Sequence, residues 1–238
     1  MRFGLWGNDV VAPAATLFIF AGTIEQTLGD PYYRQCGTAL AEKGYLCASV
    51  DLPCHGLEKR PEEPEGLAGW RYRIDHGEGK FISELNSKIS AVLDYLITNG
   101  YTDPERVAVC GTSRGGFAAL HFAASDARVK CAVAFAPVTD LAALREFDGA
   151  QQNPAVQALA LTEQAENLAG PSIWMVIGDR DKRVGTDSAI DFAGSVWQAS
   201  KDRNSNAGLE LHVLPEPRGH ATPAGASELA AAWIMNNN

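Results

Sequence analysis

The stretch CGTSRGG, residues 110–116, places a serine between two glycines in the middle of the chain. An apolar run, residues 106–111, precedes it, and a helical pattern beginning at Phe117 follows it. Glycines at 111 and 115 permit a turn too crowded for a Cβ atom. A serine in a Gly-x-Ser-x-Gly turn between a strand and a helix is typical of a catalytic nucleophile. Ser113 is therefore either a nucleophile or merely a helix cap in a tight turn.

Short apolar runs alternate with helical patterns on both sides of this turn. Several of the runs are apolar at nearly every position, as in a sheet covered on both faces. The alternation predicts an α/β fold with a mainly parallel sheet flanked by helices. The predicted strands are residues 16–22, 46–52, 106–111, 129–136, 172–178 and 210–214, and the predicted helices include 81–98, 189–197 and 222–235.

Two later strands are followed by residues that could activate Ser113. A serine hydroxyl needs a base, and the base needs an orienting carboxylate. Asp179 and Asp181 follow the strand at 172–178, and His220 follows the strand at 210–214. An isolated aspartate or histidine at such a position is more often a turn or loop residue. The order Ser, Asp, His at successive strand ends favours a nucleophile at Ser113.

Four motifs resemble the α/β-hydrolase superfamily, in its serine esterase and prolyl-oligopeptidase-like branch. They are FAG at 20–22, DLPCHG at 51–56, GTSRGG at 111–116 and GDRDKRV at 178–184. The resemblance implies Asp181 rather than Asp179 as the acid, with Asp140 as a minor option. It also implies a structural role for His55.

The same resemblance implies an oxyanion hole made of two backbone N–H groups. One belongs to Arg114, which follows the nucleophile. The other belongs to the loop Ala21-Gly22-Thr23, where members of the superfamily usually have His-Gly. Thr23 is the expected donor and Ile24 the next choice. Only residues 3–6 could form a strand before this loop, so the N-terminal part of the sheet should be reduced.

The remaining length fits one domain spanning residues 1–238, with at most a small cap. Residues 53–80 and 139–170 are insertions that could line the pocket, since long loops are often functional. Ile24, Trp70, Arg71 and Arg73 are the expected substrate-binding residues. A solvated surface strip is the alternative for the segment Trp70–Arg73.

Composition narrows the partners and the compartment. The formal net charge is −9 and no Lys/Arg cluster occurs, so nucleic-acid binding is not expected. No apolar stretch approaches the roughly 20 residues that span a bilayer, and no signal peptide is apparent, although a removed leader stays open. Five scattered cysteines without a C-x-x-C pair indicate a reducing, cytoplasmic compartment and no zinc site. No metal or organic cofactor is expected, and oligomeric state is not predicted.

Together these features predict a serine hydrolase that cleaves small or sugar-linked carboxylic esters through an acyl-enzyme. A peptidase of the prolyl-oligopeptidase type is the first alternative, although such enzymes usually carry a large N-terminal propeller. A non-catalytic binding protein on the same fold is the second alternative. Dienelactone-hydrolase-like enzymes use a cysteine nucleophile, which Ser113 does not match.

Overall fold

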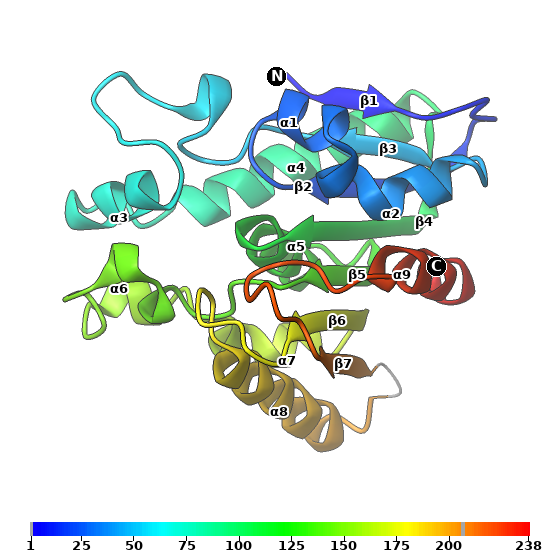
Figure 1. The fold of residues 1–238 in the computed structure, drawn as a ribbon. Coiled ribbons are helices and arrows are strands. Elements are labelled where there is room, and N and C mark those ends of the chain that lie inside the picture. Colours follow the sequence, from blue (N-terminus) through cyan, green and yellow to red (C-terminus); the bar gives the residue numbers. More distant parts are fainter. Residues whose placement is uncertain (1, 206–207) are drawn as a thin grey trace.

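The computed structural model describes residues 2–205 and 208–238, and it is built on a seven-stranded sheet (Figure 1). The strand order is β1-β3-β2-β4-β5-β6-β7. Every neighbouring pair is parallel except β1 with β3. The strands are β1 (Gly4–Trp6), β2 (Ala14–Phe20), β3 (Leu46–Ser49), β4 (Thr102–Thr112), β5 (Val129–Phe135), β6 (Ser172–Gly178) and β7 (Leu209–Leu214). The predicted mainly parallel sheet is confirmed, and β1 is as short as expected.

Helices cover both faces of this sheet, which is why its strands are apolar throughout. Alternate residues of β2 enter different cores: Phe18 and Phe20 pack with α4, α5 and α8, whereas Leu17 and Ile19 pack with α2 and α9. The helices are α1 (Ile24–Gly29), α2 (Pro31–Ala41), α3 (Leu67–Asp75), α4 (Phe81–Thr98), α5 (Arg114–Ser125), α6 (Pro154–Gln157), α7 (Ala165–Leu168), α8 (Thr186–Asp202) and α9 (Ala226–Asn237). None of the described helices is long and apolar enough to cross a membrane.

The predicted helix at 81–98 is confirmed in full, and the one at 189–197 lies within α8. The prediction that the last helix begins at Thr222 is wrong, because α9 begins at Ala226 after Gly225 with φ +75°. The Thr222 hydroxyl accepts a hydrogen bond from the Gln35 side chain instead of capping the helix. Its backbone N–H donates to the Tyr32 hydroxyl. Residues 222–225 therefore dock the chain against α2 before the helix starts.

The two long segments contain short helices and meet beyond the carboxyl ends of the parallel strands. Residues 53–80 hold the 3-10 turn η1 (Gly56–Glu58) and α3. Residues 139–170 hold α6, α7 and the 3-10 turns η2 (Leu141–Ala143), η3 (Arg145–Phe147) and η4 (Leu161–Gln164). Arg71 of α3 donates to the carbonyl oxygen of Asp148 over 3.0 Å. Figure 1 shows α3 and α6 beyond the end of the sheet at which α5 begins. Both segments thus lie where β4 delivers Ser113.

Candidate active site

Ser113 stands on a strained turn between β4 and α5, with φ +57°. A positive φ is uncommon for a residue with a Cβ and is maintained only where the surroundings enforce it. The flanking glycines explain how the turn is closed. A Cβ on Gly111 would lie 2.2 Å from the backbone of Gly115, and a Cβ on Gly115 would lie 1.9 Å from the carbonyl oxygen of Phe20. The turn therefore presses against β2 and holds the serine hydroxyl at the end of the sheet.

Ser113, His220 and Asp181 form one hydrogen-bonded chain. His220 Nε2 lies 3.0 Å from Ser113 Oγ, and His220 Nδ1 lies 2.7 Å from Asp181 Oδ2. These distances are within hydrogen-bonding range, so the ring can hold both neighbours at once. The three residues come from the loops after β4, β6 and β7, as the sequence order predicted.

The structure also separates Asp181 from the other two candidate acids. Asp179 accepts the backbone N–H of Glu216 over 3.1 Å, and thereby joins the loops that follow β6 and β7. Asp140 caps η2 by accepting the N–H of Ala142 over 2.8 Å. Neither of these carboxylates has a hydrogen bond to His220 in the described structure. Asp181 is the carboxylate that faces the imidazole.

Asp181 is almost fully buried, with 2% of its surface exposed. Burial by itself raises the pKa of this carboxyl group, but the hydrogen bond from His220 lowers it, and so do the backbone N–H groups of Val184 and Arg183. These favourable contacts prevail, and the pKa lies below its ordinary value. Hydrogen bonding to the charged form is the physical cause. Asp181 is therefore an anion at neutral pH and can orient His220.

The loop that carries His220 is held by its own ion pair. Glu216 accepts hydrogen bonds from the Arg218 side chain at 2.7 and 2.6 Å, and Arg218 also donates to the carbonyl oxygen of Thr222. Gly219 takes φ +78°, which turns the chain just before the histidine. Gly178 at the end of β6 leaves room for this loop, since a Cβ there would lie 2.8 Å from Glu216 Cβ. The loops after β6 and β7 are consequently fixed against each other.

The tight turn that carries Ser113, residues 111–115, is called the elbow below. Thr23 lies in the loop after β2, next to the elbow at Gly115. Its hydroxyl accepts the N–H of Gln26 and so caps α1, and no acceptor for its own backbone N–H occurs among the described residues. The backbone N–H of Arg114 likewise has no acceptor in the described part of the chain. Two unpaired N–H groups near a nucleophile are what an oxyanion hole requires.

The prediction for Ile24 is wrong in both its parts. Its backbone N–H donates to Asp51 Oδ1 over 2.7 Å and is not free for an oxyanion. Its side chain is buried and packs toward β1, where a Cβ on Gly4 would lie 2.3 Å from Ile24 Cγ2. Sequence reasoning missed Asp51 as the partner of this loop, although the residue opens the quoted motif DLPCHG.

Trp70 and Arg73 are structural residues, contrary to the expectation that they bind substrate. Trp70 is fully buried, and its indole N–H donates to the carbonyl oxygen of Pro53 over 2.8 Å. Arg73 is 6% exposed and forms a buried ion pair with Glu63 at 2.8 Å. Amphipathic side chains in an α/β core satisfy their polar ends internally. Both side chains stabilise the segment 53–80 from within.

Arg71 and His55 also have internal partners. Arg71 is half-buried, pairs with Asp75 one turn later at 2.8 Å, and contacts the backbone of the segment 139–170. His55 is buried, and its Nδ1 lies 2.9 Å from the carbonyl oxygen of Pro53. The structural position of His55 agrees with what the resemblance implied. Arg71 joins the two long segments.

A cavity of about 340 Å³ lies beside the elbow. It is lined by Arg114, Arg183, Glu146, Glu65 and His55, among others. The lining connects directly to the hydrogen-bonded chain, since Arg114 follows the serine and Arg183 donates its backbone N–H to Asp181. Glu146 has no signal in the sequence, and only the folded chain brings it to Arg183, at 2.6 Å.

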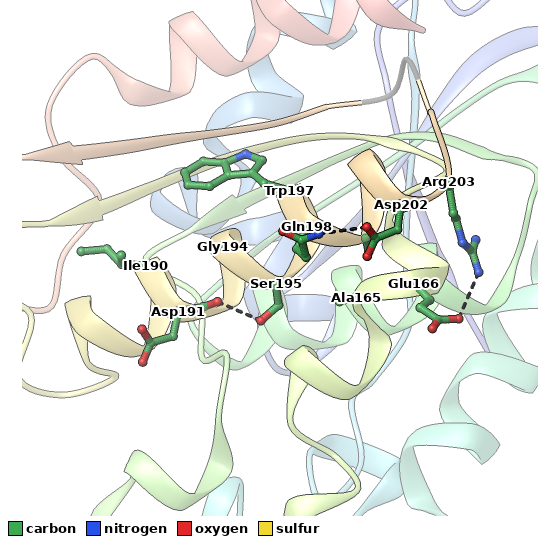
Figure 2. Close-up of a pocket in the computed structure, with 11 residues that line it drawn as sticks. Ala165, Glu166, Ile190, Asp191, Gly194, Ser195, Trp197, Gln198, Asp202 and Arg203 are labelled. Atoms are coloured by element: carbon green, nitrogen blue, oxygen red, sulfur yellow. Dashed lines mark hydrogen bonds and ion pairs between the residues drawn. The ribbon is translucent and has the colours of Figure 1, made fainter.

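A larger groove, of about 1060 Å³, lies on the outer surface of α7 and α8 (Figure 2). Trp197 and Ile190 line it, together with the ion pair between Arg203 and Glu166 at 3.3 Å. Figure 2 shows polar side chains that bond within α8 or across to α7. No member of the hydrogen-bonded chain lines this groove. In the described residues no group of three His, Cys, Asp or Glu side chains could hold a metal ion.

The chain matches the model of the prolyl oligopeptidase family over residues 83–229, which is more than half of its length. The matched region contains all three residues of the hydrogen-bonded chain. It starts within α4 and reaches α9. The match therefore covers the part of the sheet that carries the site.

Individual relatives include both peptidases and esterases. A protein of Aquifex aeolicus (strain VF5) named "Putative carboxymethylenebutenolidase" is 25% identical over 80% of this chain and 71% of its own length. The dipeptidyl peptidase family member 2 of Caenorhabditis elegans is 34% identical over 37% of this chain, which covers a tenth of that protein. The structure of acetyl xylan esterase 1 from Thermoanaerobacterium sp. JW/SL YS485 has a TM-score of 0.69 and 16% identity, over 98% of this chain and 78% of the other. This structural likeness confirms the predicted α/β-hydrolase fold.

Proposed function

The chain belongs to the prolyl oligopeptidase family and is a hydrolase, and within that class we propose that it is a serine carboxylesterase acting on small or sugar-linked esters. One observation carries the proposal. Ser113, His220 and Asp181 lie in a single hydrogen-bonded chain, with distances of 3.0 and 2.7 Å, at the end of a mainly parallel sheet. A nucleophile, a base and an orienting acid in this geometry are the components of acyl transfer.

The proposed reaction has two halves. Ser113 Oγ attacks the ester carbonyl carbon while His220 Nε2 takes the hydroxyl proton, and the carbonyl electrons move to the oxygen. The backbone N–H groups of Thr23 and Arg114 bind this oxyanion. The oxyanion collapses, the bond to the alcohol oxygen breaks, and His220 returns its proton to the leaving alcohol. Water, deprotonated by His220, then releases the acid and restores Ser113.

Asp181 keeps His220 in the tautomer this sequence of steps needs. With Nδ1–H donated to the buried carboxylate, Nε2 is left as the acceptor toward Ser113. The negative charge of Asp181 also stabilises the imidazolium that forms when the serine proton is taken. The low pKa of Asp181 supports this role, since the carboxyl group remains ionised.

The names of the relatives support the ester substrate class. The Aquifex aeolicus protein is named for a butenolide, a cyclic ester, and this chain spans most of that protein. The acetyl xylan esterase shares the fold and acts, by its name, on an acetylated sugar polymer. Small and sugar-linked esters are accordingly the substrates to test first.

A peptidase activity is the second candidate, favoured by the family match and by the dipeptidyl peptidase relative. The chemistry of the site would be the same, with an amine as the leaving group. This chain covers only a tenth of that relative, so the activity of the relative does not by itself extend to this chain. Aminoacyl 4-nitroanilides, tested beside 4-nitrophenyl acetate, distinguish the two candidates.

Replacement of Ser113 tests the proposal most directly. Ser113→Ala should lower kcat on 4-nitrophenyl acetate by about 10³-fold to 10⁶-fold. A fluorophosphonate probe should label the natural protein and not the variant. A folded Ser113→Ala protein that hydrolyses the ester at the natural rate would refute the proposal and leave the non-catalytic binding protein. His220→Ala tests the base in the same assay.

A further inference from the structure

Arg114 is exceptional among the arginines of the described residues. Each of the other buried or half-buried arginines is paired with a carboxylate or lies over an aromatic ring: Arg34 over Trp6, Arg71 with Asp75, Arg73 with Glu63, Arg128 with Asp94 and Asp126, and Arg183 with Glu146. Arg114 is half-buried and has neither kind of partner. A partly desolvated charge without a partner destabilises a fold. Such a group is a candidate for a functional role.

The guanidinium of Arg114 is held in place by one end. Its Nε donates to the carbonyl oxygen of Ala21 over 2.9 Å. Its Nη2 lies near Gly22, where a Cβ would be 3.3 Å from it and 3.2 Å from the ring of His55. Neither Nη1 nor Nη2 has a hydrogen-bond acceptor in the described structure. The free end of the fork is thus positioned beside the oxyanion loop, in the cavity described above.

The acidic residues around this cavity, Glu65 and Glu146, form no ion pair with Arg114 in the described structure. Glu146 is engaged by Arg183 at 2.6 Å, and Glu65 is exposed to solvent without an ion pair among the described residues. Burial, and then the charge of Arg114, lower the pKa of the His55 ring, so His55 adds no second positive charge to the cavity. In that ion pair, Arg183 Nη1 and Glu146 Oε2 are both buried without a hydrogen-bond partner. The free donors of Arg114 therefore lie in a cavity that also contains the carboxylates of Glu65 and Glu146.

We propose that the guanidinium of Arg114 binds a carboxylate of the substrate and makes the enzyme selective for esters that carry a negative charge. The planar fork matches the two oxygens of a carboxylate, and a charge-assisted pair of hydrogen bonds is strong where water is partly excluded. This inference rests on the proposed esterase function. It assigns to the side chain of Arg114 a task distinct from that of its backbone N–H.

Arg114→Gln isolates the guanidinium. The amide nitrogen of glutamine stands at the same distance along the side chain as arginine Nε, so the hydrogen bond to Ala21 can be kept. The backbone N–H is unchanged, and only the charged end of the fork is lost. Arg114→Lys restores a positive charge without the planar fork. Arg203→Gln, which removes one positive charge at the end of α8 away from the site, is the matched control.

The substrate carboxylate can belong to the acyl group or to the alcohol, and two pairs of esters distinguish these sources. Mono-(4-nitrophenyl) adipate is compared with the 4-nitrophenyl ester of adipic monoamide, and 4-acetoxybenzoate with 4-acetoxybenzamide. Within each pair a carboxylate is replaced by its uncharged amide. The natural enzyme should prefer the carboxylate by kcat/KM in at least one pair, and Arg114→Gln should reduce that preference by about tenfold to a hundredfold. Arg114→Lys should restore part of it, and Arg203→Gln should leave it intact.

Two results would overturn the inference: the absence of a preference for the carboxylate in both pairs, or equal losses on charged and neutral esters in Arg114→Gln. Equal losses would mean that the side chain acts on the oxyanion or its loop. Calorimetric binding of mono-(4-nitrophenyl) adipate to Ser113→Ala protein, with and without Arg114→Gln, gives an answer that needs no turnover. If no ester is hydrolysed, the proposed function fails, and this binding comparison still decides the role of Arg114.

Discussion

Ile24 donates its backbone N–H to Asp51 Oδ1 over 2.7 Å. This bond holds the end of the loop after β2, in which Thr23 directly precedes Ile24. The second carboxylate oxygen of Asp51 accepts the N–H of Leu57 and a hydrogen bond from Arg2. A buried aspartate thus ties the loop proposed to hold the oxyanion to the turn after β3. We expect the orientation of the Thr23 N–H to depend on this link.

Replacing Asp51 should therefore impair catalysis without removing any group of the site. For Asp51→Ala we expect kcat on 4-nitrophenyl acetate to fall by at least about tenfold with little change in KM, since small misplacements of catalytic groups are costly. Asp51→Asn keeps an acceptor for Ile24 and should retain most of the activity. Steady-state kinetics, with circular dichroism to confirm folding, provides the measurement. Identical losses in the two variants would show that the bond to Ile24 is not the cause.

Asp181→Asn should lower kcat by about 10⁴-fold, because an amide favours the wrong tautomer of His220. The matched control is Asp179→Asn, which alters the acceptor of the Glu216 N–H and should stay active. Steady-state kinetics on 4-nitrophenyl acetate measures both. A larger loss of kcat in Asp179→Asn than in Asp181→Asn would show that Asp181 is not the acid.

The pKa of Asp181 also predicts a pH dependence of stability. Because the folded pKa lies below the ordinary value, the charged form stabilises the fold at any pH above that ordinary value of about 3.9. This contribution is lost as the pH falls from there through the folded pKa. The stability advantage of the natural protein over Asp181→Asn should shrink over that range, as followed by urea unfolding at pH 7, 5, 4 and 3. An advantage that grows toward low pH would contradict the direction of the shift.

The buried pair of Glu63 and Arg73 should dominate the stability of the segment 53–80. Glu63→Gln leaves Arg73 buried without a counter-charge, and we expect a loss of about 3–5 kcal/mol in the free energy of unfolding at pH 7. The hydrogen bond from Arg73 lowers the pKa of Glu63 to about 2 against the opposing effect of burial. The difference in the free energy of unfolding between Glu63→Gln and the natural protein should therefore narrow as the pH falls from about 4.5 toward 2. Asp75→Asn breaks an exposed pair and should cost less than about 1 kcal/mol.

Two glycines in helices should respond in opposite ways to alanine. Gly115→Ala places a Cβ 1.9 Å from the carbonyl oxygen of Phe20, so the elbow must shift and activity should be lost with a marked fall in Tm. Gly194 in α8 has no atom within 4 Å of the added Cβ. Gly194→Ala should raise the free energy of unfolding by about 0.5–1 kcal/mol. Calorimetric Tm and esterase activity check both variants, and an active Gly115→Ala would mean that the elbow is not tightly packed.

Much of the fold could be predicted because the relevant information is local in the sequence. Continuous apolar runs and the 3.6-residue period of helices located β4, α4 and the strands that follow. The boundary at Thr222 was missed because its hydroxyl is used by Gln35, a residue distant in the chain. The same limit applies to Trp70 and Arg73, whose types suggested a surface site. Their burial depends on Pro53 and Glu63, which no spacing rule connects to them.

The sequence alone determined the tight turn at Ser113, the order of Ser113, Asp181 and His220, and the alternation of strands and helices that brings the strand ends together. These follow from local sterics and from the rule that parallel strands end at one edge. Only the tertiary structure decided which backbone N–H groups stay free. Asp51 accepts the N–H of Ile24, whereas the N–H of Thr23 has no acceptor among the described residues. Tertiary structure alone also paired Glu146 with Arg183 and left Arg114 without an ion pair among the described residues. These contacts depend on how distant segments pack against each other. They leave no periodic pattern in the sequence from which they could be predicted.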